Sequence, residues 1–375
     1  MKTINVAKPY LPPEDIKLIL QEAEAILTSG MLMQGPRVEQ FERAFADYVG
    51  TAHAVAVNSG TSALQSILQY YDVAGSEVIV PVNTFLASAN AVLFCSGKPV
   101  FAEMNPQTLC MDFEDMKRRI TPKTKGVIVV HLSGLIQPDI DHIQTFCKEH
   151  NLFMVEDAAH AHGSSHTGKR AGSLGDAAAF SFLATKVITS GGEGGMVTTN
   201  DPQLAHRVKS LRFHGEDTTR GIQDRIGHSW RMTELQAVIG RLQVQRLDEI
   251  VDKRMTIAKA YDAAFSDNQH ISSITVSPED VHAYYKYPLI LSAALSRPII
   301  KERLEKEHGV KTGTSYWPPC HLQPAYRTAF GYKEGDFPVA EDVLNRTISL
   351  PMHCELSAED IQQVIQGVHT VCRRP

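Results

Sequence analysis

The chain has 375 residues, 43% of them hydrophobic and 21% charged, which is typical of a globular protein long enough for two domains. Its formal net charge of -5 and the lack of a basic block give no reason to expect a nucleic acid or an anionic membrane as partner. The six cysteines form no C-x-x-C pair, and no stretch reads as a signal peptide or a membrane span, so we expect reduced thiols and a cytoplasmic location.

From about residue 50 to 200, short β-branched runs alternate with helical patterns, which predicts a parallel sheet covered by helices. The predicted strands are 54–57, 77–80, 99–102, 126–130, 152–155, 177–182 and 195–199. Several are apolar on both faces, as expected of buried parallel strands. Helices are expected to begin near Thr61, Thr84, Asp141 and Asp201, and Pro202 after Asp201 makes a good cap followed by a first helical residue.

A different pattern follows residue 230. Apolar residues near a period of 3.6 over 233–264 predict one long helix that carries the chain into a second domain. The segment 283–291 reads as a strand, Arg297–His308 as a helix and 316–324 as a proline-rich loop. We therefore expect a large domain over residues 1–250 and a smaller C-terminal one over 251–375.

Lys186 follows the predicted strand 177–182 and precedes the glycine-rich run 191–195, while Asp157 comes at the end of an earlier strand. The carboxyl ends of strands in an open α/β sheet face the ligand crevice. A lysine there can form a Schiff base with an aldehyde cofactor while an aspartate protonates the cofactor's ring nitrogen. The pair predicts pyridoxal 5′-phosphate (PLP), although Lys186 alone also fits a solvated residue and Asp157 a helix cap.

A phosphate site is predicted where Ser59, Gly60 and Thr61 join a strand to a helix. Backbone N–H groups at a helix N-terminus bind anions, and a glycine lets a phosphate approach closely. A helix cap with a turn glycine is the alternative. Ser181, five residues before Lys186, is placed to reach the same phosphate.

Two other motifs can be interpreted as a dinucleotide-binding site and a metal site, and neither interpretation fits. The run 191–195 precedes a strand instead of linking a strand to a helix, so it does not fit a dinucleotide-binding motif. His160 and His162 lack a third ligand at a recognisable spacing, so no metal is expected. His160, three residues after Asp157, is expected beside the cofactor's phenolic oxygen.

The chain resembles the DegT/DnrJ/EryC1/StrS family of PLP-dependent sugar aminotransferases over nearly its full length. The segments that carry the resemblance are TSGMLMQGP at 28–36, AVNSGT at 56–61, VPVNTF at 80–85, EDAA at 156–159, SFLATK at 181–186, LRFHG at 211–215 and HLQPAY at 321–326. It implies the type I PLP-dependent transferase fold of aspartate aminotransferase. In that α/β fold a mainly parallel seven-stranded sheet flanked by helices is followed by a smaller C-terminal α/β domain.

The resemblance also implies roles for individual residues. Lys186 would be the Schiff-base lysine and Asp157 the partner of the ring nitrogen, with Phe85 stacked on the ring. Gly60, Thr61 and Ser181 would bind phosphate. The working unit would be a homodimer with its sites at the interface, each completed by Gln34 and Ser229 of the neighbouring chain. Ser229 stands where the family commonly has asparagine. Gln34, Arg231, Tyr316 and His321 are the substrate candidates.

The implied reaction moves an amino group from an amino acid, expected to be L-glutamate, to a keto- or aldehydo-sugar, with pyridoxamine 5′-phosphate as the intermediate cofactor form. This is the chemistry of amino-sugar and polysaccharide biosynthesis. Lys186 argues against the dehydratase branch of the family, which has histidine there. His160 stands where the family often has glutamine. It leaves open non-nucleotide acceptors such as an oxidised octulosonate, a sugar phosphate or a cyclitol. A PLP-binding regulatory protein without turnover is the alternative from another class.

Overall fold

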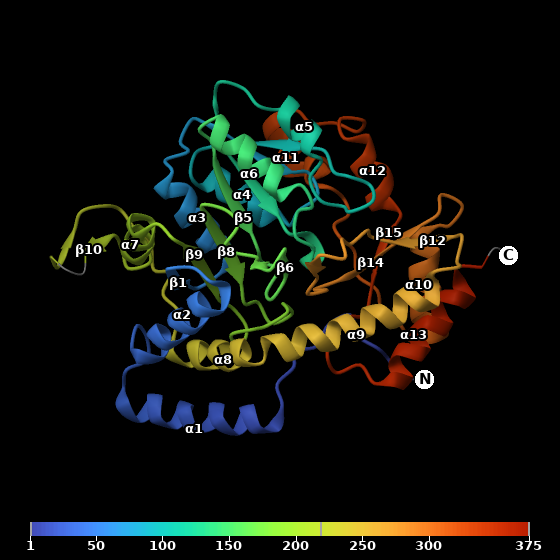
Figure 1. Cartoon of the computed structure of the whole chain (residues 1–375), viewed down its shortest axis with the longest axis horizontal. Helices are drawn as coiled ribbons and strands as arrows, with labels where there is room; N and C mark the ends of the chain where they lie inside the picture. The colour runs from blue at the N-terminus through green and yellow to red at the C-terminus, as the bar shows by residue number, and fades with distance from the viewer. Residues whose placement is uncertain (1, 218–219, 374–375) are drawn as a thin grey trace.

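A seven-stranded sheet forms the centre of the larger part of the protein (Figure 1). The computed structural model describes residues 2–217 and 220–373. In sheet order the strands are β1 (His53–Val57), β9 (Gly195–Thr199), β8 (Ala177–Ser181), β5 (Phe153–Asp157), β4 (Thr124–Val130), β2 (Glu77–Pro81) and β3 (Lys98–Ala102). Only β9 runs antiparallel to its neighbours within this sheet. The predicted mainly parallel sheet is therefore confirmed, with all seven predicted strands present.

Helices cover both faces of this sheet, as buried parallel strands require. Along β2, Val78 and Val80 belong to one core, and Ile79 between them belongs to the other. The first core is closed by α3 (Gly60–Tyr70), α4 (Leu86–Phe94), α7 (Pro202–Leu211), α11 (Pro324–Phe330) and α12 (Pro338–Asn345). The second is closed by α2 (Pro36–Val49), α5 (Phe113–Arg118), α6 (Ile140–Glu149) and α8 (Glu234–Gln245).

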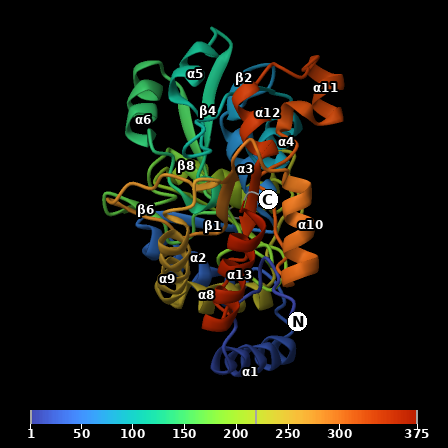
Figure 2. The same ribbon diagram turned by 90° about the vertical axis from the view of Figure 1, so that its right-hand side faces the viewer.

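A smaller sheet of three antiparallel strands supports the C-terminal part. Its strands are β12 (Ile271–Ser273), β14 (Tyr287–Leu291) and β15 (Thr347–Leu350), and the helices α9 (Leu247–Phe265), α10 (Arg297–His308) and α13 (Ala358–Val371) share a core with it. Figure 2 shows α10 and α13 side by side. Two features cross the expected boundary at residue 250: Ile4 joins this core, and α9 runs through the boundary. The exact division of the domains stays a prediction.

Two predicted elements differ from the structure. The single helix expected over 233–264 is two helices, because the backbone at Arg246 (φ -100°, ψ 3°) leaves the helical conformation. The Arg246 side chain pairs there with Asp15 of α1 (Pro13–Ser29), a contact that periodicity cannot reveal. The strand expected over 283–291 begins only at Tyr287, because Tyr284 has a positive φ of 45°.

The predicted helix starts hold to within two residues. Asp201 caps α7 by accepting a hydrogen bond from the Gln203 N–H, with Pro202 as the first helical residue. α3 and α6 begin one residue before the predicted positions, and α4 begins two residues after Thr84. The short strands outside the two main sheets are β6 (Ser165–His166), β7 (Lys169–Arg170), β10 (Glu216–Asp217), β11 (Ile222–Gln223) and β13 (Asp280–Val281).

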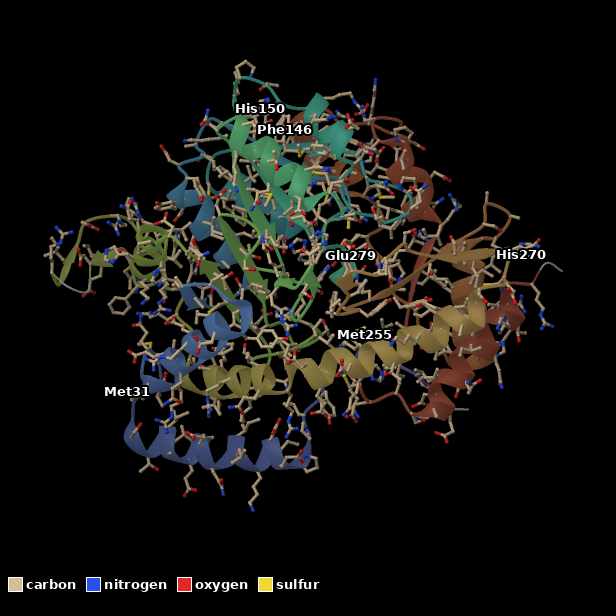
Figure 3. All side chains as sticks on the ribbon, in the orientation of Figure 1. Met31, Phe146, His150, Met255, His270 and Glu279 are labelled. Atoms are coloured by element: carbon tan, nitrogen blue, oxygen red, sulfur yellow. The ribbon has the colours of Figure 1, made fainter. Side chains whose placement is uncertain are left out.

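The N-terminal helix α1 lies along α8, where Ile26 packs against Val238 and Leu242 (Figure 1). The connection from α1 to α2 leaves large apolar side chains exposed, and Figure 3 shows Met31 at this edge of the molecule. Within residues 2–217 and 220–373, no helix combines the length and the apolar character needed to cross a membrane.

Candidate active site

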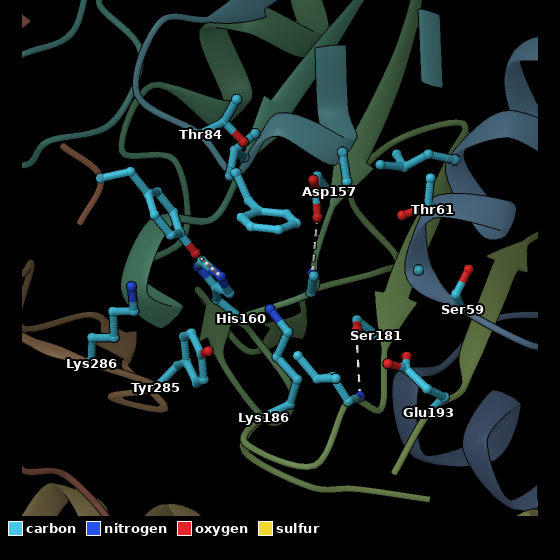
Figure 4. Close-up of a pocket in the computed structure, with 18 residues that line it drawn as sticks. Ser59, Thr61, Thr84, Asp157, His160, Ser181, Lys186, Glu193, Tyr285 and Lys286 are labelled. Atoms are coloured by element: carbon cyan, nitrogen blue, oxygen red, sulfur yellow. Dashed lines mark hydrogen bonds between the residues drawn. The ribbon is translucent and has the colours of Figure 1, made fainter. Parts of the chain in front are cut away.

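A cavity of about 370 Å³ opens at the carboxyl ends of the central strands (Figure 4). Asp157 ends β5 and Ser181 ends β8, and these two strands are parallel neighbours in the sheet. Ser59 and Gly60 follow β1 at the start of α3. This is the edge where open α/β sheets bind ligands, and it brings together residues from three strand ends.

Lys186 reaches into this cavity from the turn after β8. Its Nζ lies 4.8 Å from the centroid of the Tyr285 ring. Burial lowers the pKa of Lys186 to about 8, while the Asp157 carboxylate acts in the opposite direction. A lysine with this pKa is partly a free amine near neutral pH, which is the form that attacks an aldehyde. Gly191 (φ 87°) adopts a left-handed backbone conformation in the loop that follows.

The carboxylate of Asp157 is held by two hydrogen bonds. Ser88 Oγ donates to Oδ2 at 2.7 Å, and the Ala159 N–H donates to Oδ1 at 3.2 Å. Ser88 Oγ also lies 2.7 Å from Thr84 Oγ1. These hydrogen bonds fix the Asp157 carboxylate so that it faces the cavity. The sequence offered no signal for Ser88, because a serine inside an apolar helix has no distinguishing neighbours.

The N-terminus of α3 forms the opposite end of the cavity. Ser59 Oγ accepts a hydrogen bond from the Ser62 N–H at 3.1 Å, so its hydroxyl caps the helix. A Cβ at Gly60 would lie 2.8 Å from Ser181 Cβ, and one at Gly195 would lie 2.2 Å from the Ser59 carbonyl oxygen. Only glycine lets the start of α3 approach β8 and β9 this closely, and the first N–H groups of a helix are donors that suit an anion.

His160 is already bonded within the chain through both ring nitrogens. Nδ1 accepts a hydrogen bond from the Ser133 N–H at 3.2 Å, and Nε2 lies 3.0 Å from Tyr316 Oη. The ring stacks on Tyr285 with centroids 4.3 Å apart. Burial, together with Lys186 and a neighbouring lysine, lowers the pKa of His160 well below its usual value. The ring is therefore neutral, and Nε2 carries the proton that is donated to Tyr316 Oη.

Tyr285 and Lys286 line the cavity, and the sequence prediction missed both. They were assigned to the interior of a strand, whereas they lie just before β14. The only signal was a lysine after two tyrosines directly before a buried apolar run. Tyr316 and Phe85, both predicted, also line the cavity, with ring centroids 5.9 Å apart. Phe85 is 57% exposed, unusual for a phenylalanine, and offers its ring to a flat ligand.

Four predicted site residues lie outside this cavity: Gln34, Ser229, Arg231 and His321. The side chain of His321 is fully buried, and its Nε2 lies 2.8 Å from Glu341 Oε1. Arg231 donates to Ser229 Oγ and lies over the Phe213 ring, 5.0 Å from its centroid. In this chain Arg231, Ser229 and His321 therefore contact one another or the core rather than the cavity.

His162, the other half of the possible metal pair, packs between two phenylalanines. Its ring centroid lies 5.2 Å from that of Phe180 and 5.3 Å from that of Phe182. Over residues 2–217 and 220–373, no three His, Cys, Asp or Glu side chains are grouped so as to hold a metal ion.

The groups gathered in the cavity fit PLP. Lys186 and Asp157 both line the cavity, and with PLP bound Lys186 would hold the aldehyde carbon and Asp157 would pair with the ring nitrogen. The N-terminus of α3 offers a phosphate site, and Phe85 offers an aromatic face. The fit rests on a lysine with a lowered pKa and on glycines whose replacement would close the anion site.

Comparison with known proteins agrees with this fit. The sequence matches the DegT/DnrJ/EryC1/StrS aminotransferase family over residues 13–369. It is 37% identical over 380 residues to the spore coat polysaccharide biosynthesis protein SpsC of Bacillus subtilis (strain 168), with 97% of each chain covered. It is 36% identical over 374 residues to the GDP-perosamine synthase of Caulobacter vibrioides, with 98% of each covered. The PLP-form of Spr1654 from Streptococcus pneumoniae matches the structure with a TM-score of 0.91 at 27% identity, covering 99% of each chain.

Proposed function

Because this chain belongs to the DegT/DnrJ/EryC1/StrS family and is a PLP-dependent aminotransferase, we propose that it transfers the amino group of L-glutamate to a nucleotide-linked keto-sugar. One observation carries the proposal: Lys186, Asp157 and the N-terminus of α3 face a single cavity. The GDP-perosamine synthase relative supports a nucleotide-linked acceptor, and the SpsC relative supports a role in polysaccharide biosynthesis.

Bound PLP supplies an aldehyde carbon that takes up and releases the amino group, and a ring that withdraws electrons from the substrate carbon. In our proposal Lys186 Nζ is the group that would hold that aldehyde carbon when no substrate is bound. In the first half-reaction Nζ would move a proton from the substrate carbon that bears the amine to the cofactor carbon that receives it, and in the second it would move a proton from that cofactor carbon to the acceptor carbon. Such placed proton transfer typically contributes about 10²–10⁴ in rate, and the lowered pKa of Lys186 favours the free amine that it needs.

The other residues hold the cofactor in position. Asp157 accepts the hydrogen bond of the protonated ring nitrogen, and Ser88 and the Ala159 N–H keep its carboxylate aimed there. Gly60, Thr61 and Ser181 bind the phosphate at the start of α3. Phe85 covers one face of the ring, which adds about 1 kcal/mol beyond burial.

We also propose a homodimer in which Gln34 and Ser229 complete the partner's site. Gln34 directly follows an exposed apolar segment, and that segment contacts the start of α8 through a hydrogen bond from the Glu234 N–H to the Leu32 carbonyl. The exposed large side chains of this region are Leu27, Met31, Leu32, Met33 and Leu235. Such a surface is typical of a protein interface. A cytoplasmic location stays a prediction from the sequence.

A screen of acceptors tests the substrate class. The protein loaded with pyridoxamine 5′-phosphate is mixed with nucleotide-linked keto-sugars, and the return of the PLP absorbance is followed. Free keto-sugars, keto-sugar phosphates, oxidised sugar acids and cyclitol ketones form the second set, because His160 left those acceptors open. Lys186→Ala serves as the inactive control.

We expect the nucleotide-linked sugars to react with kcat/KM at least about tenfold above the second set, a difference of about 1.4 kcal/mol. A preference for any member of the second set would overturn the nucleotide-linked acceptor. Reaction with glutamate but with no carbonyl acceptor of either set would overturn a sugar as substrate.

A further inference from the structure

Lys286 is a second lysine in the active-site cavity, and nothing proposed so far uses it. Its Nζ donates one hydrogen bond, to the Thr314 carbonyl oxygen at 2.7 Å. Across residues 2–217 and 220–373 no carboxylate lies within ion-pair distance of it. Ammonium groups removed from water are ordinarily paired, so an unpaired one that faces a cavity indicates an anionic ligand.

The two lysines face the same aromatic ring. Lys286 Nζ lies 5.8 Å and Lys186 Nζ 4.8 Å from the Tyr285 ring centroid. In Figure 4, Lys186 and His160 lie between Lys286 and Tyr285 on one side and Asp157, Ser181 and Ser59 on the other. Lys286 and the predicted phosphate site therefore lie on opposite sides of Lys186. At the position of Lys286 we expect the substrate rather than the cofactor phosphate.

Tyr316 supplies a second donor at the same place. Lys286 Nζ lies 4.0 Å from the Tyr316 ring centroid. Because His160 Nδ1 accepts from Ser133, His160 Nε2 donates to Tyr316 Oη, and the hydroxyl proton of Tyr316 is left to donate elsewhere. One hydroxyl proton and two ammonium protons are thus available on neighbouring side chains.

We propose that Lys286 and Tyr316 form a carboxylate-binding subsite that receives an acidic group of the substrate. The subsite rests on the proposed function, which offers two sources of a carboxylate: the amino-acid donor, and a nucleotide-linked sugar that itself carries an acid group. Burial and Lys186 lower the pKa of Lys286 to about 7, and a bound carboxylate would stabilise the protonated lysine again. No other cation among the lining residues is free for this task, because Lys186 is assigned to the cofactor.

Unreactive carboxylates test the subsite without turnover. Calorimetry at pH 6.5 measures glutarate binding to the pyridoxamine-loaded protein, with the uncharged diamide of glutarate as matched ligand. Lys286→Met should weaken glutarate binding about 10- to 100-fold, the usual loss for a charge-assisted hydrogen bond, and leave the weak binding of the diamide unchanged.

Two further variants separate charge from structure. Lys286→Gln keeps a donor for the Thr314 carbonyl but removes the charge, so it should lose as much affinity as the methionine variant. Lys125→Met is the control, because Lys125 also donates to a backbone carbonyl, that of Asp72, but at the exposed surface. Glutarate binding that is unchanged in Lys286→Met, or restored in Lys286→Gln, would overturn the subsite.

Half-reactions identify the source of the carboxylate. If it belongs to the donor, wild type should prefer L-glutamate to its α-amide, and Lys286→Met should lose that preference about 10- to 100-fold in kcat/KM. If it belongs to the acceptor, the variant should lose only acidic sugars. Loss of neither would refute the proposal. Glutarate binding that depends on Lys286 in a protein without amino transfer would refute the proposed function and leave the subsite standing.

Discussion

Asp157→Asn isolates the charge of the carboxylate from its packing. Asparagine has nearly the same shape, and its side-chain oxygen can still accept the 3.2 Å hydrogen bond from the Ala159 N–H. The Ser88 hydroxyl, 2.7 Å from Oδ2, can rotate and accept from the new amide. The stability of the apo-protein should therefore change by about 1 kcal/mol or less.

The cofactor should respond far more strongly than the fold. The amide replaces a charge-assisted hydrogen bond to the ring nitrogen, which is worth about 1.5–3 kcal/mol, so PLP affinity should fall about 10- to 100-fold. The rate of a single turnover with L-glutamate should fall by about 10²–10³, as for other preorganised electrostatic groups. Removal of the Asp157 charge should also lower the pKa of Lys186 below about 8, because Asp157 now acts to raise it.

Equilibrium dialysis, rapid-mixing absorbance and thermal unfolding measure these three quantities on one preparation. Asp176→Asn is the control, since Asp176 accepts from the Met154 N–H at 2.8 Å near the start of β5, away from the cavity. That variant should lose stability and keep its single-turnover rate. If Asp157→Asn reacts within a few-fold of wild type, Asp157 acts only as a structural cap and our assignment is refuted.

The remaining predictions concern the lysine, its neighbours and the assembly. Lys186→Ala should fold and bind PLP without covalent attachment, and normal borohydride trapping or turnover in this variant would rule out the assignment. In the apo wild type, covalent capture of PLP should rise with pH around a midpoint of about 8, because the pKa of Lys186 is lowered and only the free amine reacts; a midpoint above 10 would contradict this. Ser88→Ala should reduce the single-turnover rate about tenfold with an unchanged KM for the acceptor, because it frees the Asp157 carboxylate. Mixing Lys186→Ala with Ser229→Trp should restore one working site per mixed dimer, and no recovery after confirmed subunit exchange would argue against shared sites.

The cofactor side of the cavity could be predicted because it is built from strand ends. Buried parallel strands can be recognised in the sequence as short apolar runs, and their carboxyl ends lie at one edge of the sheet. The prediction that Asp157 lies at a strand end is therefore confirmed, and the structure adds that the strand ending at Ser181 is its parallel neighbour. The start of α3 could also be predicted from the sequence, because Ser59 is a typical residue for capping a helix N-terminus.

Other residues could not be predicted because their partners are distant in the sequence. Ser88 lies inside α4, and its bond to Asp157 spans 69 residues. The predicted single helix is interrupted at Arg246, whose side chain bonds to Asp15 of α1, 231 residues away. Periodicity reports on which face of an element is buried and carries no information about such pairings.

The side of the cavity lined by Tyr285 and Lys286 is formed by a loop before β14 rather than by strand ends. This explains why the acceptor is harder to infer from the sequence than the cofactor. The segment before β14 is held by backbone carbonyls: the buried Arg254 of α9 donates to the carbonyls of Tyr284 at 2.9 Å and Met352 at 3.1 Å. Lys286 in turn donates to the carbonyl of Thr314. Every residue has a carbonyl, so no sequence pattern marks the residues that accept these hydrogen bonds, and the path of this loop cannot be read from the sequence. An identity of 36% with GDP-perosamine synthase supports the common cofactor chemistry, and we propose that the choice of substrate depends on the few loop residues that line this side.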